Sequence, residues 1–242
     1  MQGLIGPLKE LAEFEELCKN KKKDVGMIRV CGCVNSQKSH MMYALGDGCK
    51  YKVIACSSET KAKQIYEEYR FLDSNTYLYP AKDFLFYQAD IRSKELVKQR
   101  MEGIQAVLSG EPVTVVTSLD GFMDHLAPKE SIAEKVLKIQ NDSVLKLDEM
   151  AEKLSVIGYD REVQVEGPGQ FAVRGGILDI YPLTEELPVR IELWGDEVDS
   201  IRTFDVESQR SIENLEELVI YPATEVPADS KRIEEGLKRM EA

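Results

Sequence analysis

The sequence is poor in several residue types, and each shortage excludes a class of protein. Its 242 residues include one Trp and two His. No apolar run approaches the roughly 20 residues that a membrane-spanning helix needs. The first residues, MQGLIGPLKELAEFEEL, are amphipathic and acidic, and they lack the basic start and apolar core of a signal peptide. The five Cys all lie in the first quarter of the chain, and an odd count without an export signal favours reduced thiols and a cytoplasmic location.

Basic residues are scarce relative to acidic ones, which bears on nucleic-acid binding. Lys and Arg number 31 against 43 Asp and Glu, and the formal net charge is −12. Such a charge argues against a module that grips DNA through its overall charge. Residues 1–140 hold 20 basic and 19 acidic residues, whereas residues 141–242 hold 11 and 24. The two parts differ in surface character, which indicates at least two domains.

The first part of the chain has the pattern of a parallel α/β domain. Amphipathic periodicity predicts helices, and short apolar or β-branched runs predict strands. The predicted helices span residues 7–18, 38–44, 60–69 and 93–108, and the predicted strands span residues 27–30, 51–56, 76–79 and 113–117. Strands that alternate with helices predict a parallel, doubly wound sheet.

After about residue 125 the pattern changes to short β segments with tight turns. A strand at 132–139 and a helix at 147–157 are followed by predicted strands at 170–173, 177–181, 189–194, 198–204 and 218–221, and by a charged helix at 229–240. The Gly195-Asp196 turn between two of these runs is typical of a β-hairpin. We therefore expect a smaller α+β domain with mostly antiparallel sheet.

One motif is close to a nucleotide-binding loop but departs from it at one position. Gly32, Lys38 and Ser39 match the G-x-x-x-x-G-K-[ST] pattern of a P-loop, between the first predicted strand and its helix. Gln37 replaces the second glycine, which lets the backbone approach phosphates, and its side chain would project into the phosphate nest. No acidic metal partner is evident after the strand at 113–117. We predict a degenerate P-loop without nucleotide, with ATP binding as the alternative.

The other candidates for chemistry favour structural roles. Cys31 and Cys33 could supply half of a thiol metal site, but no second Cys pair follows, so we expect no metal. His40 and His125 have no evident nucleophile partner, and no catalytic residue is predicted. The aromatic residues between 77 and 87 could stack on nucleic-acid bases. Packing between domains is favoured for them because a basic groove is missing.

Three charged residues of the second part form a candidate interface. Arg161, Arg174 and Glu192 fall on or beside the predicted antiparallel strands. Arg174 precedes Gly175-Gly176, a bend that would present its guanidinium at a sheet edge. Arginine anchors many protein interfaces through forked hydrogen bonds. The alternative is that these are ordinary surface arginines paired with local acids, which contribute little.

Two long stretches resemble the bacterial transcription-repair coupling factor family. They are GPGQFAVRGGILDIYP at 167–182 and RIELWGDEVDSIRTFD at 190–205, and the shorter stretches Tyr79-Pro80-Ala81, Phe86-Tyr87 and Gln99-Arg100 also fit. The resemblance covers essentially the whole chain and corresponds to the N-terminal part of that family, which is similar to the excision-repair protein UvrB.

The resemblance implies a division into domains. Residues 1–125 would form a degenerate RecA-like domain, and residues 126–213 would form a domain that binds the damage sensor UvrA. Residues 214–242 would begin a truncated return to the first domain.

The resemblance also implies which residues contact UvrA. Arg174 occupies the second arginine position of a Phe-Arg-Val-Arg-Gly stretch in UvrB, and Arg161 sits where UvrB has another contacting arginine. Glu192 matches an acidic position, and Phe171 lies beside this cluster in the sequence. The first arginine of the UvrB stretch is Ala172 here, so one contact is expected to be absent or replaced.

From the resemblance we expect a monomeric UvrA-recruiting module of transcription-coupled nucleotide excision repair, without enzyme activity, cofactor or membrane contact. The family's longer chain adds a domain that binds RNA polymerase and a translocase that uses ATP and Mg on double-stranded DNA. Its C-terminal domain masks the UvrA-binding surface. The alternatives are a nucleotide-dependent DNA-remodelling domain that uses Lys38 and Ser39, and a DNA-binding module.

Overall fold

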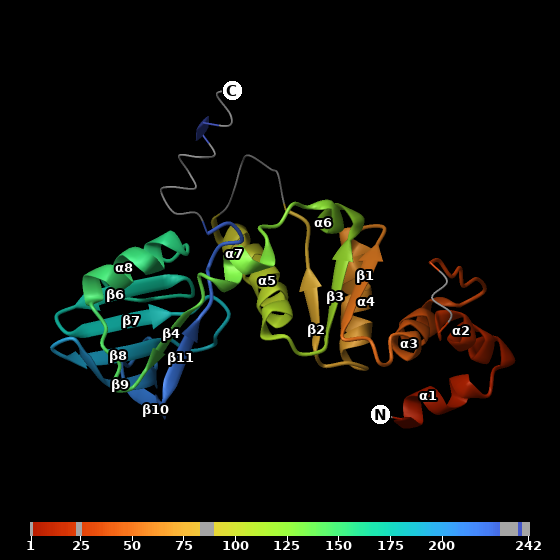
Figure 1. Cartoon of the computed structure of the whole chain (residues 1–242), viewed down its shortest axis with the longest axis horizontal. Coiled ribbons are helices and arrows are strands. Elements are labelled where there is room, and N and C mark those ends of the chain that lie inside the picture. The colour runs from red at the N-terminus through yellow and green to blue at the C-terminus, as the bar shows by residue number, and fades with distance from the viewer. Residues whose placement is uncertain (1, 23–25, 83–89, 228–236, 239–242) are drawn as a thin grey trace. The chain divides into compact units, whose positions relative to one another are not determined.

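The chain forms two compact units in a computed structural model that describes residues 2–22, 26–82, 90–227 and 237–238 (Figure 1). The first unit comprises residues 1–83 and 109–124, and the second comprises residues 84–108 and 125–242. Helix α5 (Asp90–Ser109) therefore belongs almost entirely to the second unit, although it lies between two strands of the first unit in the sequence. The domain limits implied by the resemblance stay a prediction.

A three-stranded parallel sheet with the order β1-β3-β2 forms the centre of the first unit. Its strands are β1 (Tyr51–Cys56), β2 (Thr76–Tyr79) and β3 (Val113–Ser118), which confirms three of the four strands predicted there. Helix α4 (Glu59–Arg70) begins at Ser58, whose hydroxyl accepts a hydrogen bond from the Lys61 amide. Its Ala62 and Ile65 side chains are buried with Val116 in the core of this unit. The short helix α6 (Leu119–Met123) follows β3.

The N-terminal part of the first unit differs from its prediction. Residues 27–30 form no strand, and Met27 is 84% exposed. A four-residue apolar run does not by itself provide a neighbouring strand to pair with, which explains the error. The single helix predicted at 7–18 is instead two helices, α1 (Gln2–Lys9) and α2 (Ala12–Lys22). Apolar residues spaced by three drift around a helix of 3.6 residues per turn, so one straight helix could not bury them all.

Helix α3 (Asn35–Leu45) packs against these two helices. Its Ala44 forms a small core with Ile5 of α1 and Phe14 of α2. The helix predicted at 38–44 is thereby confirmed, three residues longer at its start and one at its end.

The second unit contains a six-stranded sheet with the order β10-β9-β8-β7-β6-β5 and a separate pair, β11-β4 (Figure 1). All neighbouring strands are antiparallel except β5 and β6, which confirms the predicted fold class. The strands are β4 (Leu137–Gln140), β5 (Asp160–Arg161), β6 (Gln170–Arg174), β7 (Ile177–Tyr181), β8 (Val189–Trp194), β9 (Glu197–Phe204), β10 (Ser211–Leu215) and β11 (Glu217–Ile220).

Several elements of this unit depart from the sequence patterns. The strand predicted at 132–139 is replaced by helix α7 (Lys129–Ala133), which follows Pro128, and by β4. Strands β5 and β10 were not predicted, because one has two residues and the other, SIENL, is mostly polar. The helix predicted at 147–157 is confirmed as α8 (Leu147–Val156). Most of the helix predicted at 229–240 lies outside the described residues.

An apolar row of side chains crosses the middle of the six-stranded sheet. Strand register aligns Val173, Leu178, Ile191 and Ile201 across β6, β7, β8 and β9. Leu178, Ile191 and Ile201 are at most 1% exposed. Successive side chains of a strand point to opposite faces, so the next row along must lie on the other face.

Among the described residues, no helix is both long and apolar enough to cross a membrane.

Candidate protein interface on the six-stranded sheet

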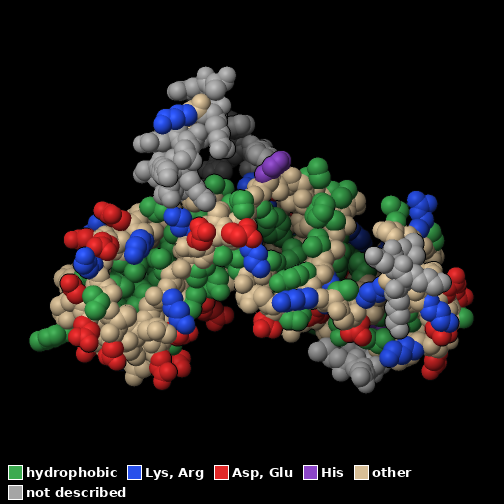
Figure 2. Space-filling view, viewed as in Figure 1, with side chains coloured by type: hydrophobic (Ala, Val, Ile, Leu, Met, Phe, Trp, Pro, Cys, Tyr) green, Lys and Arg blue, Asp and Glu red, His purple; other side chains and the backbone are tan. Residues whose placement is uncertain are grey.

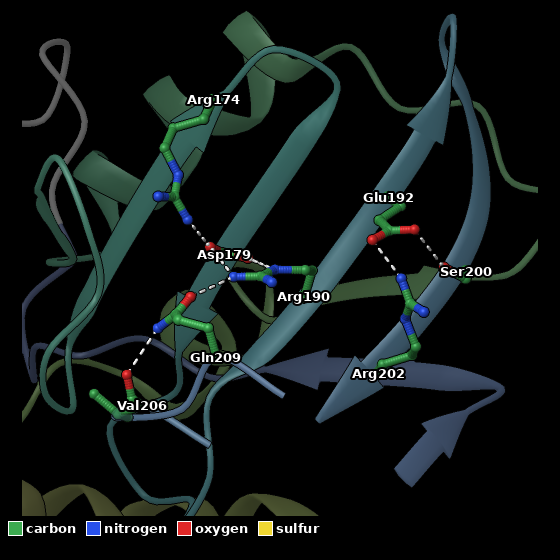
Figure 3. A network of polar contacts seen from close by, with 8 residues as sticks. All are labelled: Arg174, Asp179, Arg190, Glu192, Ser200, Arg202, Val206 and Gln209. Atoms are coloured by element: carbon green, nitrogen blue, oxygen red, sulfur yellow. Dashed lines mark hydrogen bonds and ion pairs between the residues drawn. The ribbon is translucent and has the colours of Figure 1, made fainter. Parts of the chain in front are cut away.

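The row of side chains next to the apolar row of the six-stranded sheet is largely polar. Strand register aligns Ala172, Asp179, Arg190 and Arg202 across the same four strands. A further row on the same face contains Arg174 of β6 and Glu192 of β8, which lie on either side of Ile177 of β7. We call the face with Arg174, Asp179, Arg190, Glu192 and Arg202 the polar face (Figure 3).

A buried carboxylate lies at the centre of the polar face. The Asp179 side chain is 2% exposed. Arg190 holds both of its oxygens, with Nε donating to Oδ1 at 2.7 Å and Nη2 donating to Oδ2 at 2.9 Å. Arg174 donates from Nη2 to Oδ2 at 2.7 Å. A carboxylate taken out of water is costly unless it is paired and hydrogen-bonded, and the two guanidinium groups meet that need.

Residues from several parts of the sheet hold the Arg190 side chain in place. Its guanidinium carbon lies 4.5 Å from the centre of the Phe204 ring, and its Nη2 also donates to Gln209 Oε1 at 2.8 Å. Gln209 in turn donates to the Val206 carbonyl at 2.8 Å (Figure 3). The hydrogen bonds with Asp179 raise the pKa of Arg190 above its ordinary value. Arg190 is therefore a structural cation of the sheet.

Glu192 and Arg202 form a second ion pair on the polar face. The Ser200 hydroxyl donates to Glu192 Oε2 at 3.5 Å. The Nε atom of Arg202 is buried and has no hydrogen-bond partner among the described residues. Both side chains are about one-third exposed, at 35% for Glu192 and 28% for Arg202.

The structure brings two of the four predicted contact residues together. Arg174 and Glu192 lie on one face, two strands apart, which places their backbones about 10 Å from each other. The Arg174 side chain is 44% exposed, and Asp179 is the one described group that binds its guanidinium. Arg174 therefore has nitrogens available to a partner.

The other two predicted residues lie elsewhere. Arg161 is exposed on β5, opposite Phe171 in the register, and its side chain makes no hydrogen bond or ion pair within the described part of the chain. Phe171 is 0% exposed, so the structure does not bring it to the polar face, and its contact with a partner stays a prediction. Phe171 and Arg174 are three positions apart in one strand and so point to opposite faces, which closeness in sequence does not reveal.

Sequence reasoning missed the residues that organise this face. Asp179 lies among apolar residues in ILDIY, and Arg190 and Arg202 occupy the polar positions of alternating strands, as in VRIELW. Charged residues in otherwise buried strands are rarely left without partners, and this was the signal that could have found them.

The P-loop-like segment has a different geometry from the one predicted. Gly32 has a φ of +86°, but no strand precedes it. Gln37 does not extend outward, because its Oε1 accepts a hydrogen bond from the Val34 amide at 3.2 Å at the start of α3. The Gln37 side chain thus occupies a backbone amide of this loop, and the loss of phosphate binding stays a prediction.

The two remaining polar residues of the motif also have partners within the chain. Lys38 Nζ donates to Asn35 Oδ1 at 3.1 Å. The Ser39 hydroxyl donates to Glu68 Oε2 at 2.7 Å, and Ser39 is 3% exposed. A hydroxyl that is buried against a carboxylate is poorly placed to bind a metal-phosphate group.

The cysteines are free thiols in this structure. Cys31 is exposed and Cys33 is half-buried. Within the described ranges, no group of three or more His, Cys, Asp or Glu side chains is arranged to hold a metal ion.

Comparisons with known proteins identify relatives of this chain and a family model that matches part of the second unit. Residues 137–226 match the family described as the UvrB interaction domain. The chain is 33% identical over 222 residues to a transcription-repair-coupling factor of Bacillus subtilis (strain 168), a match that covers 90% of this chain and 19% of the relative.

Staphylococcal proteins give further matches. Transcription-repair-coupling factors of Staphylococcus epidermidis and Staphylococcus aureus are 38% and 36% identical over 153 and 157 residues, or 63% and 64% of this chain and 13% of each relative. The chain thus spans between 13% and 19% of the length of these relatives. The resemblance stated from the sequence is confirmed. Residues 137–226, which include the polar face, match the UvrB interaction domain family within a chain that is similar to a transcription-repair-coupling factor over nine tenths of its length.

Proposed function

We propose that this chain is a docking module that recruits UvrA in transcription-coupled nucleotide excision repair. The observation that carries the proposal is the match of residues 137–226 to a UvrB interaction domain, since this range contains every strand of the polar face. The chain would act by recognition, without catalysis and without a cofactor of its own.

The charges of the polar face support a protein partner with acidic groups. The three arginines share the carboxylates of Asp179 and Glu192, and Arg174 is the most exposed of the three, which leaves its guanidinium to meet an acidic group of a partner. The rest of the second unit is rich in acidic side chains (Figure 2). A small basic site on an acidic surface favours a defined register with one partner and disfavours broad attraction to DNA.

Arg174 is the residue best placed to make the charged contact. It is held by Asp179 at one nitrogen and is still nearly half-exposed, so its guanidinium is oriented before a partner arrives. A side chain that is already ordered loses less entropy on binding. Glu192 would contribute the complementary charge. Arg161 pairs in register with Phe171, which points away from the polar face, so its predicted contact with UvrA would lie outside that face.

The P-loop-like segment has no part in the proposed function. Its Gln37, Lys38 and Ser39 side chains are engaged within the chain, which supports a segment that holds no nucleotide. Binding of RNA polymerase and ATP-driven movement on double-stranded DNA would belong to regions of the longer relatives that this chain does not span. The C-terminal domain of such a relative would compete with UvrA for the polar face.

Calorimetric titration of the 242-residue chain with purified UvrA tests the proposal. The unmodified chain should bind, and Arg174→Ala should weaken binding about thirty-fold. Arg70→Ala removes an exposed arginine of the first unit and should bind like the unmodified chain. Absence of binding by the unmodified chain would refute the proposed function. Unchanged affinity in the Arg161→Ala/Arg174→Ala double variant would refute the assignment of the site.

A further inference from the structure

The one tryptophan of the chain lies in solvent at the end of β8. Trp194 is 86% exposed, the largest side chain among the strongly exposed hydrophobic residues of the described chain. Its backbone is firmly placed, because Trp194 pairs with Glu197 across the hairpin and Gly195 makes the turn with a φ of +65°. A large apolar side chain exposed to water on a well-ordered strand is a frequent mark of a binding surface.

Trp194 lies on the polar face. Arg190, Glu192 and Trp194 alternate along β8, and alternate residues of a strand share a face. A bulge lies between Glu192 and Leu193, but it does not change the face on which Trp194 lies. After the bulge Leu193 pairs with Val198, which is buried on the apolar face, so Trp194 lies on the polar face. The exposed tryptophan therefore continues the line of the two ion-paired residues.

A second exposed apolar residue lies beside the tryptophan. Val144 is 78% exposed and forms a bridge with Glu197, on the side of Glu197 opposite to Trp194. The Leu145 amide donates to the Asp196 carbonyl at 2.7 Å, which fixes the loop to the hairpin. The end of the sheet thus carries two apolar side chains in a row with one carboxylate.

The turn that follows Arg174 lies next to this end of β8. The Leu193 amide donates to the Gly176 carbonyl at 2.8 Å. The approach is close, since a Cβ at Gly176 would come within 3.0 Å of the Leu193 carbonyl oxygen. The charged residue of the proposed UvrA site and the exposed tryptophan therefore lie at neighbouring ends of the same sheet face.

We propose that Trp194 is the apolar anchor of the surface that docks UvrA, with Arg174 as its charged neighbour. This inference rests on the proposed function and names the residue that would supply most of its affinity. Most of the binding free energy of a protein interface comes from a few aromatic and arginine side chains near its centre, which polar contacts surround. The partner surface it requires has an apolar pocket for the indole ring, with acidic groups on the side toward Arg174.

UvrA is a better occupant of this surface than a second copy of the chain. The tryptophan lies within residues 137–226, which match the UvrB interaction domain, and on the same face as the exposed Arg174, which suits an acidic group of that partner.

Binding of UvrA to three variants tests the anchor. Trp194→Ala should weaken binding about thirty-fold or more, and Trp194→Phe should weaken it less because it keeps an aromatic ring. Phe71→Ala is the matched control, since Phe71 is an aromatic residue of the first unit with 87% exposure. It should bind like the unmodified chain. Circular dichroism should show that all three variants are folded, because neither side chain is buried.

A fluorine label reports on the same residue without a mutation. The chain labelled with 5-fluorotryptophan has one fluorine signal, from Trp194, and this signal should shift or broaden when UvrA is added. If the unmodified chain binds UvrA while Trp194→Ala binds equally well and the fluorine signal does not move, the anchor is refuted and the proposed function stands. If the unmodified chain does not bind UvrA, the proposed function fails.

Sedimentation of the chain alone should show a monomer, and a dimer that Trp194→Ala abolishes would overturn the choice of UvrA as occupant.

Discussion

The two arginines that share Asp179 should differ sharply in their effect on stability. Arg190 makes two hydrogen bonds to the carboxylate, stacks on Phe204 and has a side chain that is 16% exposed. Arg174 makes one and is 44% exposed. Removing one partner of a buried ion pair costs about 3–5 kcal/mol, whereas a largely exposed pair contributes about 0–1 kcal/mol. Because Arg174 would remain on Asp179, we expect Arg190→Ala to cost about 3 kcal/mol, at the low end of the buried range.

Thermal unfolding followed by circular dichroism measures this difference. A loss of about 3 kcal/mol corresponds to a fall in melting temperature of about 6–12 °C for a chain of this size, and Arg174→Ala should lower it by no more than about 2–4 °C. Hydrogen exchange in β7 and β8 should rise in Arg190→Ala, which locates the loss at the polar face. Equal melting temperatures for the two variants would refute the view that Arg190 is structural and Arg174 is available to a partner.

Two further predictions concern the first unit. Burial raises the pKa of Asp73, but hydrogen bonds from Lys52 and Thr114 and the charge of Lys52 outweigh it and lower the pKa below its ordinary 3.8. Ionised Asp73 therefore stabilises the fold above about pH 3.8, and this contribution is lost as the pH falls through the lowered pKa. Asp73→Asn should be less stable than the unmodified chain at pH 7, and urea titrations should show the gap closing at acid pH; a gap independent of pH would contradict this. The chain should also give no calorimetric signal with ATP, and micromolar affinity that is lost in Lys38→Ala would contradict the proposal that the P-loop-like segment holds no nucleotide.

Most strands with an apolar or β-branched pattern were predictable, and the errors arose where pairing with a neighbouring strand, rather than composition, decides whether a strand forms. The β7 and β8 strands have the predicted bounds, because apolar alternation and a nearby turn are local properties of the sequence. The run at 27–30 is just as apolar but has no strand beside it, and a short run carries no information about a neighbour. The polar strand β10 shows the converse, since it forms by pairing with β9 and not through its own composition.

The polar face was only half predictable for the same reason. Arg174 and Glu192 stood out in the sequence, but their partners Asp179 and Arg202 come from neighbouring strands and are set by register. Register also gives a physical account of the departure at Ala172, which stands where the UvrB stretch has its first arginine. Ala172 faces Asp179 and is 1% exposed, so no partner contact passes through this position. Both oxygens of Asp179 are already held by Arg174 and Arg190, so a small side chain at 172 leaves the buried carboxylate satisfied. A UvrA surface that docks on this face must therefore rely on Arg174 and the exposed end of β8 instead.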